Sequence, residues 1–294
     1  MEKHAFIPPV VLVFAASDPT CGAGIQADIL TIARLGGHPA TVLTALTVQD
    51  TAGVAQVVPV GAALVREQAQ AILEDMPIAA LKLGVLGSAE NATMIARLVT
   101  DFLARHPEVP LVVDPVLASG RGDALADAQQ QEILRETLLP LAALLTPNLP
   151  EARAVLRTAI SPASPPSLSC ARPTERQALA EGLLALGPRH VLLTGTHDAT
   201  DDVVNSLYSR EGLIREDRWP RLPESYHGSG CTLASAIAAK LARGMALEAA
   251  VRTAEEFVWQ SLAHGYQPGK GQYVPQRLFG IANEATCAVE QSLD

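Results

Sequence analysis

Residues 10–28, with the sequence VVLVFAASDPTCGAGIQAD, join a continuous apolar run to a turn of small residues. An apolar run without polar alternation is typical of a strand buried on both faces of a parallel sheet. Gly22 and Gly24 allow the turn to bend tightly and to approach a ligand at a helix start. They are equally compatible with a tight turn that binds nothing. The stretch therefore predicts a strand–turn–helix unit of an α/β protein.

Further apolar runs alternate with amphipathic stretches along the rest of the chain. We expect strands at 40–48, 111–114, 143–146 and 190–194, and helices at 25–35, 65–73, 89–103, 127–138, 174–186, 231–242 and 247–264. This alternation predicts about six to eight right-handed βαβ units and a doubly wound α/β layer structure. Residues 214–229 are expected to be irregular.

The composition indicates one folded domain rather than a disordered or polyanion-binding chain. The chain has 294 residues, 48% hydrophobic and 18% charged, with a net charge of −9 and only 4% aromatic residues. The acidic balance argues against a general nucleic-acid or membrane-surface binder. We expect a single domain over 1–294 with a core at about 10–265 and a C-terminal tail at about 270–294. The Pro/Ser-rich segment 161–173 is interpreted as an exposed loop, because the alternation resumes unchanged after it.

The cysteines and the N-terminus indicate the cellular compartment. Cys21, Cys170, Cys231 and Cys287 lie far apart without a CxxC pair, which argues against a disulfide scaffold or a zinc ribbon. The apolar run 10–16 is too short to span a bilayer and has no cleavage-site pattern after it. We therefore expect a cytoplasmic protein.

Polar residues follow several of the predicted strands, where doubly wound sheets bind their ligands. Asp28 is expected in the first turn of its helix, where it either complements the helix dipole or points into the cleft as a ligand group. Gln49 has the paired donor and acceptor that can read the edge of a heteroaromatic ring, although a lone glutamine is usually a surface residue.

A second group of polar residues is suited to a hard cation. Asp114 ends a buried strand, where an unpaired carboxylate would be costly. Asn148 and Glu151 follow another strand across Pro150 and also fit an ordinary helix start. Carboxylate and amide oxygens that converge from adjacent strand ends suit Mg²⁺.

The segment HGSGCTLASA at 227–236 brings small residues into the start of a helix. The free N–H groups of a first helical turn form an anion hole for a transferring phosphoryl group. We expect these amides to lower the pKa of the Cys231 thiol. The alternative is a small, buried cysteine with no chemical role.

Five segments together resemble a known family. They are ASDPTCGAGIQAD at 16–28, ALTVQDTAGV at 45–54, VVDPV at 112–116, LTPNLPEA at 145–152 and HGSGCTL at 227–233. Over about residues 10–265 the chain resembles the hydroxymethylpyrimidine/phosphomethylpyrimidine kinases of thiamine biosynthesis, in the ribokinase-like superfamily. The resemblance implies a three-layer α/β/α sandwich with a mostly parallel doubly wound sheet. It also implies ATP and Mg²⁺ as cofactors, a homodimer, and stepwise phosphorylation of 4-amino-5-hydroxymethyl-2-methylpyrimidine to the diphosphate.

The resemblance also implies roles for individual residues. Those expected near the pyrimidine are Gln49, Asp28, Ala23 and Val85. Those expected near the ATP phosphates are Asp114, Asn148, Thr194 and Thr196, with Asp114 and Glu151 as metal ligands. Gly228, Gly230 and Cys231 would form the catalytic anion hole, and Cys231 would act either as a general base or only as part of that hole.

Departures from the family pattern leave other functions to consider. Thr194-Gly195-Thr196-His197 stands where the family commonly has Lys-Gly-Gly-His, so a phosphate-facing charge is missing. This absence motivates a non-catalytic pyrimidine-binding regulatory protein as one alternative. A pyridoxal/pyridoxine kinase is the other main alternative, because it phosphorylates a similar hydroxymethyl heteroaromatic. A cysteine hydrolase that pairs Cys231 with His197 or His227 is a poorer third.

Overall fold

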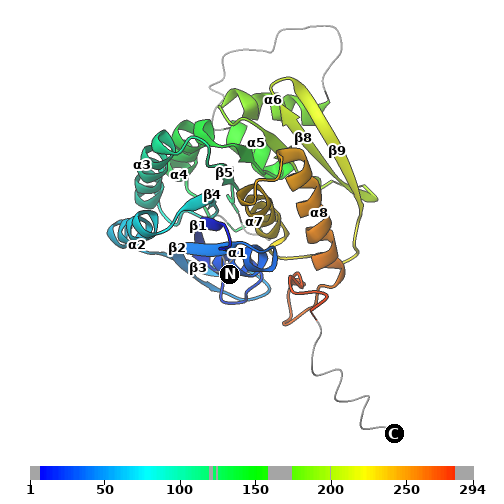
Figure 1. The fold of residues 1–294 in the computed structure, drawn as a ribbon. Helices are drawn as coiled ribbons and strands as arrows, with labels where there is room; N and C mark the ends of the chain where they lie inside the picture. The colour runs from blue at the N-terminus through cyan, green and yellow to red at the C-terminus, as the bar shows by residue number, and fades with distance from the viewer. Residues whose placement is uncertain (1–6, 119–121, 124, 158–173, 199, 282–294) are drawn as a thin grey trace, which may run out of the picture.

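The computed structural model describes residues 7–118, 122–123, 125–157, 174–198 and 200–281 (Figure 1). The expected loop 161–173 and the end of the expected tail lie outside these residues. Within them, no helix is long and apolar enough to cross a membrane.

The described strands form one nine-stranded sheet in the order β3-β2-β1-β4-β5-β6-β7-β8-β9. Their bounds are β1 Val10–Ser17, β2 His38–Gln49, β3 Val54–Pro59, β4 Ile78–Leu83, β5 Leu111–Val113, β6 Leu144–Leu145, β7 Val191–Leu193, β8 Asp202–Ser209 and β9 Gly212–Pro220. The strands from β2 to β7 in this order run parallel, whereas β3, β8 and β9 pair antiparallel. The expected mostly parallel, doubly wound sheet is confirmed.

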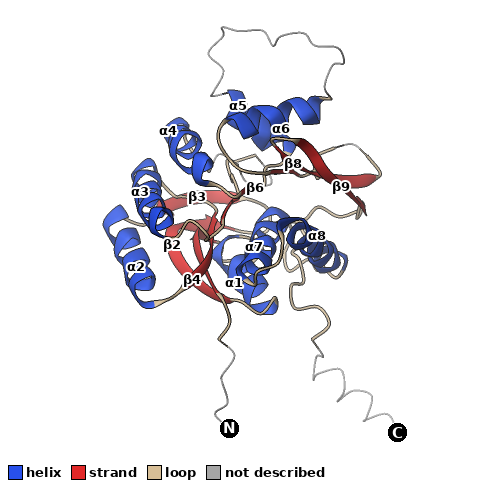
Figure 2. Ribbon diagram, turned by 45° about the horizontal axis from the view of Figure 1, so that its top comes forward, coloured by secondary structure: helices blue, strands red, loops and turns tan. Residues whose placement is uncertain are grey.

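Helices cover both faces of the sheet and complete three layers (Figure 2). One face packs against α1 (Gly24–Arg34), α7 (Ser229–Ala242) and α8 (Leu247–Ala263). The other face is covered by α2 (Ala62–Asp75), α3 (Ala89–Arg105), α4 (Ala128–Ile133), α5 (Leu149–Arg157) and α6 (Glu175–Ala185). After α4 the chain continues through a π turn at Leu134–Leu138 and a 3₁₀ turn at Leu139–Leu141.

Strand β1 explains why the apolar runs are continuous. Val11 and Val13 contribute to the core under α1, α7 and α8, whereas Leu12 and Phe14 contribute to the core on the opposite face. All four are almost fully buried. Successive side chains point to opposite faces of a strand, so a sheet covered on both sides requires apolar residues at every position.

Two expectations about the elements were wrong. Residues 214–220 belong to strand β9, although we expected them to be irregular. Only five of the connections between described strands contain a helix, rather than six to eight, because β2–β3, β7–β8 and β8–β9 are antiparallel neighbours. The strand β9, GLIREDRWP, has a largely exposed face and therefore no continuous apolar run.

The chain after α8 packs back onto the body, although we expected a tail from about position 270. Tyr266 pairs with Val274 in an isolated bridge, and Tyr273 pairs with Tyr226. Val274 and Arg277 are buried. Residues up to 277 therefore belong to the described core.

Candidate active site

The β1–α1 loop is organised by the carboxylate of Asp18. It accepts hydrogen bonds from the backbone N–H groups of Thr20 (2.8 Å) and Ala23 (2.7 Å) and from the Thr20 hydroxyl (2.8 Å). Burial would raise the pKa of Asp18, but His227 and these donors hold it below its ordinary value. Gly24 adopts φ +60°, and a Cβ there would lie 2.6 Å from Ala16 O. This position therefore requires a glycine.

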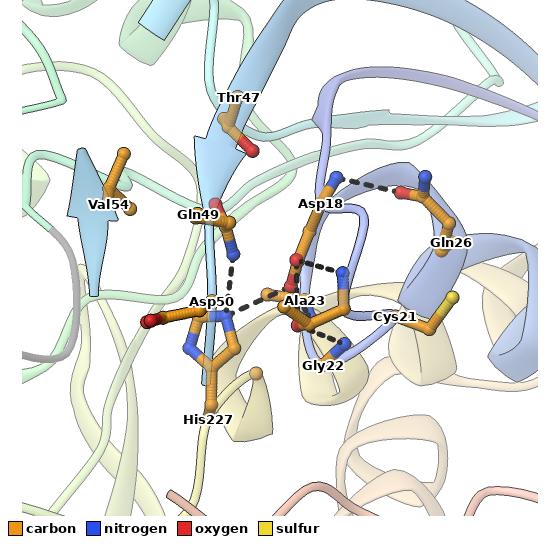
Figure 3. A network of polar contacts seen from close by, with 12 residues as sticks. Asp18, Cys21, Gly22, Ala23, Gln26, Thr47, Gln49, Asp50, Val54 and His227 are labelled. Atoms are coloured by element: carbon orange, nitrogen blue, oxygen red, sulfur yellow. Dashed lines mark hydrogen bonds and ion pairs between the residues drawn. The ribbon is translucent and has the colours of Figure 1, made fainter. Parts of the chain in front are cut away.

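Gln49 lies at the end of β2 and faces this loop across His227 (Figure 3). The His227 Nε2 atom is 3.0 Å from Asp18 Oδ2 and 3.3 Å from Gln49 Nε2. A carboxylate only accepts, so His227 Nε2 carries the proton and donates it to Asp18. That nitrogen then has no lone pair for Gln49. The Gln49 amide therefore keeps its own protons for another partner.

Helix α7 presents its N-terminus close to the same loop. It begins at Ser229 after Gly228, whose φ is +85°, and no side chain caps its first turn. Gly228 packs so closely on Gly22 O that a Cβ there would clash with it. The prediction that the small residues of 227–236 enter a helix is therefore confirmed. Uncapped N–H groups and the helix dipole favour an anion at this point.

Asp114 follows β5 and lies beside the start of α7. The residue is 5% exposed, and its Oδ2 atom is buried without a hydrogen-bond partner. Burial raises the pKa of Asp114 even though Lys82 opposes the shift. An adjacent cavity is lined mainly by apolar residues: Leu83, Leu86, Val113, Pro115, Val116, Leu117, Ala126 and Leu134. An unsatisfied buried carboxylate oxygen is a ready ligand for a cation.

Cys231 differs from the sequence expectation. Burial raises the pKa of its thiol above the ordinary value, and the negative charge of Asp114 adds to that increase. Lys82 opposes the shift but does not reverse it. The expected lowering of this pKa is therefore wrong for the free protein, because desolvation and a neighbouring carboxylate outweigh the amides of the helix.

Asn148 and Glu151 form a reciprocal cap at the start of α5. Glu151 Oε2 accepts from Asn148 N (3.0 Å), and Asn148 Oδ1 accepts from Glu151 N (2.9 Å). Burial, followed by the charge of Asp114, raises the pKa of Glu151 to about 8. The expected helix start is therefore present, and Glu151 also lies close enough to Asp114 to respond to its charge.

Asp114 and Glu151 could supply part of the ligand set of a magnesium ion, with other groups completing it. Within the described part of the chain, no three or more His, Cys, Asp or Glu side chains are grouped to hold a metal. Mg²⁺ is usually bound through one or two carboxylates, with waters and substrate phosphates as the remaining ligands. Asp114 and Glu151 meet that pattern, and the unpartnered Asp114 Oδ2 supplies an open ligand position.

Asp28 does not lie where we expected it. Helix α1 begins at Gly24, so Asp28 is beyond the first turn, and its side chain is fully buried. Its two oxygens accept from Lys82 Nζ at 3.0 and 3.1 Å, and Oδ1 also accepts from Ser235 Oγ. The Asp28 carboxylate is therefore enclosed in an ion pair and does not point into an open cleft.

The remaining candidates lie at neighbouring strand ends. Val85 is half-buried after β4, and its carbonyl accepts from Thr44 Oγ1. Thr194 is half-buried after β7 and pairs with Asn148 in an isolated bridge. Thr196 is exposed, and so is Gly230 in the first turn of α7. Ala23 is half-buried in the β1–α1 loop.

Sequence reasoning missed three polar residues of the site: Asp18, Lys82 and Arg277. Lys82 is fully buried on β4, and a lysine inside the apolar run IAALKL was the available signal. Asp18 stands at the end of the first strand run and could have been found by the same strand-end reasoning. Arg277 had no signal, because its partners are more than 40 residues away.

Comparisons with known proteins show what the chain is similar to. A family model described as phosphomethylpyrimidine kinase matches residues 18–276. A hydroxymethylpyrimidine/phosphomethylpyrimidine kinase of Streptomyces coelicolor is 38% identical over 90% of this chain and 92% of its own length. A thiamine biosynthesis bifunctional protein of Geobacter sulfurreducens is 38% identical over 89% of this chain and 50% of its own. A solved structure of Staphylococcus aureus pyridoxal kinase with AMP-PCP and pyridoxal superposes with a TM-score of 0.77. It is 27% identical and covers 92% of this chain and 94% of that one.

Proposed function

The chain belongs to the phosphomethylpyrimidine kinase family, and from this premise we propose that it phosphorylates a hydroxymethylpyrimidine and then its monophosphate, with ATP as donor, in thiamine biosynthesis. The observation that carries the proposal is the meeting of a helix N-terminus, the buried carboxylate of Asp114, the half-buried carboxylate of Glu151 and a side-chain amide at one edge of the sheet. A non-catalytic binding protein would not need an unsatisfied carboxylate beside an anion-binding helix start.

The phosphoryl group would be held at the N-terminus of α7. Phosphoryl transfer depends mainly on positioning and on neutralising charge. Gly228 and Gly230 leave the backbone N–H groups of this turn accessible, and Asp114 and Glu151 would hold Mg²⁺ beside them. Mg²⁺ would supply charge neutralisation to the phosphates. The Thr194 hydroxyl and the Asn148 amide, on the next two strand ends, would contact the nucleotide phosphates, with Thr196 further along that loop.

Cys231 would act as part of the anion hole rather than as a thiolate base. Its raised pKa keeps the thiol protonated at neutral pH, so it is a hydrogen-bond donor in the free protein. A neutral thiol adds no negative charge next to a transferring phosphoryl group. This is the more favourable arrangement at the positive end of α7.

The pyrimidine would bind between Gln49 and the β1–α1 loop. An amide can donate to a ring nitrogen and accept from an exocyclic amine at the same time. His227 and Asp18 hold the loop beside Gln49, Ala23 offers a small contact surface, and Val85 offers an apolar one. Asp28 has no place in this pocket, because its carboxylate is already paired.

Gln49→Leu tests the substrate assignment. An unpaired polar group in a closed pocket costs about 1–3 kcal/mol, so KM for the pyrimidine should rise by about tenfold or more while KM for ATP stays nearly unchanged. Gln70→Leu on the exposed face of α2 is the matched control. ADP formation should be measured separately with the alcohol, its monophosphate and pyridoxal.

The outcomes separate the candidate functions. Turnover of both pyrimidines and little turnover of pyridoxal would support the proposal. Preferential turnover of pyridoxal would indicate the alternative kinase activity, and no ADP formation with any of them would indicate a binding protein. An altered KM for ATP alone in the Gln49 variant would overturn the placement of the pyrimidine.

We also propose a homodimer that forms through the β2–β3 hairpin at the sheet edge. Leu46, Val48 and Val58 are 50%, 55% and 42% exposed, and Leu46 and Val58 are cross-strand neighbours. Exposed apolar side chains on an edge hairpin are typical of an interface. Sedimentation equilibrium should give twice the 30.9 kDa chain mass, and a monomer at micromolar concentration would contradict the proposal.

A further inference from the structure

Arg277 is a buried cation whose hydrogen-bond partners are all neutral. Arg277 is only 2% exposed. Nε donates to Thr232 Oγ1 (3.0 Å), Nη1 to Cys21 O (3.1 Å) and Nη2 to Gly22 O (2.5 Å). No described carboxylate forms an ion pair with it. Burial of a guanidinium without a counter-charge is costly, so the contacts it makes require an explanation.

The three acceptors belong to the two elements that would bind the substrates. Cys21 and Gly22 lie in the β1–α1 loop, next to Ala23. Thr232 lies in the first turn of α7, and its hydroxyl donates to Gly228 O (2.7 Å). The planar side chain of Arg277 therefore links the β1–α1 loop, which would bind the pyrimidine, to the start of α7, which would bind the phosphoryl group. The five N–H donors of a guanidinium have a fixed geometry, which suits this task.

The segment that carries Arg277 also touches the other parts of the pocket. Gly271 N donates to Thr51 Oγ1, and Gln272 N donates to Thr51 O, in the turn that follows Gln49. His227 N donates to Tyr273 O (2.8 Å). We call residues 271–277 the C-terminal strap. It joins the β2–β3 turn, the segment before α7 and the β1–α1 loop.

We propose that Arg277 is a positioning residue of the kinase site: its guanidinium sets the spacing between the β1–α1 loop and the first turn of α7. The inference rests on the proposed kinase function. Correct spacing brings the hydroxymethyl oxygen of the substrate to the phosphoryl group. Small misplacements of reacting groups cost large factors in rate. The effect should therefore appear in kcat more than in KM for ATP.

The test compares Arg277→Met and Arg277→Lys with a matched control, Arg34→Met. Arg34 Nη2 donates to Phe279 O (3.1 Å), and its guanidinium lies over the Phe279 ring. Its hydrogen bond and its ring contact thus attach the chain just beyond the strap to α1, not to the β1–α1 loop or to α7. Removing either arginine weakens the attachment of the C-terminal segment, but only the Arg277 variants remove the link between the two substrate-binding elements.

We expect Arg277→Met to lower kcat by about tenfold or more and Arg277→Lys to recover part of it, with Arg34→Met within about twofold of the parent. Melting temperatures should be measured so that kcat is compared well below unfolding. Arg277→Met with kcat within about twofold of the parent, or Arg34→Met with an equal loss, would overturn the proposal.

A second readout does not depend on the proposed activity. Hydrogen–deuterium exchange of the backbone amides of residues 232–236, followed by peptide mass spectrometry, reports how firmly the start of α7 is held. We expect faster exchange in Arg277→Met than in the parent and in Arg34→Met. Unchanged exchange would contradict the positioning role. If the parent protein forms no ADP with any pyrimidine while the exchange result holds, the proposed function fails and the positioning role stands.

Discussion

The substitution Lys82→Met should destabilise the protein by leaving a buried carboxylate unpaired. Lys82 and Asp28 are both fully buried, and Lys82 Nζ lies 3.0 and 3.1 Å from the two oxygens of Asp28. Burial disfavours the ammonium, but Asp28 raises the pKa of Lys82 above its ordinary value, so Lys82 is charged. Without Lys82, Asp28 retains only the hydrogen bond from Ser235.

The expected cost follows from the geometry of this pair. Breaking a buried ion pair by removing one partner costs about 3–5 kcal/mol. For a chain of this size that loss corresponds to roughly 6–10 °C in melting temperature. The double variant Lys82→Met/Asp28→Leu should recover most of the loss, because replacing both charges with apolar groups is often neutral.

Urea unfolding followed by circular dichroism measures these differences. The control is Arg153→Met, which removes the exposed Arg153–Glu175 pair and should cost less than about 1 kcal/mol. A loss below about 1 kcal/mol for Lys82→Met would refute the reasoning. So would a double variant whose loss equals the sum of the two single losses, because it would show that Lys82 and Asp28 do not stabilise each other.

Two further predictions concern other buried groups. Burial, followed by Asp217, raises the pKa of Glu255 to about 7, so its favourable contribution is present below its unfolded pKa and is lost as the pH rises towards 7. Glu255→Gln should therefore gain up to about 3 kcal/mol over the parent between pH 5 and pH 8 in urea titrations, and a constant difference would contradict this. Cys231→Ala should lower kcat by only about tenfold, and Cys231→Ser should keep most of it, because the thiol donates a hydrogen bond. Losses of more than about 10³-fold in both variants would indicate a thiolate base.

The apolar pattern predicted those strands that are covered on both faces. Strands β1, β5, β6 and β7 have continuous apolar runs because helices pack on each side of the sheet. The pattern failed for β9, an edge strand in which residues 215–218 form a run of four charged side chains. It also failed for β4, where Lys82 interrupts the apolar run. A buried charge is stable there only because Asp28, 54 residues away in the sequence, neutralises it.

Some residues of the candidate site could likewise be predicted from local sequence, whereas others are placed only by contacts between distant parts of the chain. Strand-end reasoning selected Gln49 and Asp114 because doubly wound topology brings such ends to one edge, wherever the intervening helices lie. It could not place Arg277, whose acceptor Cys21 O is 256 residues away. The chain folds the end of the molecule back onto its first loop, and no periodicity in the sequence encodes that contact.

The pKa of Cys231 shows why a local rule can give the wrong sign. The sequence reveals the start of a helix, and a helix N-terminus by itself lowers the pKa of a thiol. It does not reveal that the thiol is desolvated or that Asp114, from another strand, stands beside it. Both of these effects disfavour the thiolate, and together they exceed the effect of the helix. A cysteine at a helix start is therefore a candidate nucleophile or base only when its tertiary neighbours are known, and here those neighbours favour a protonated donor.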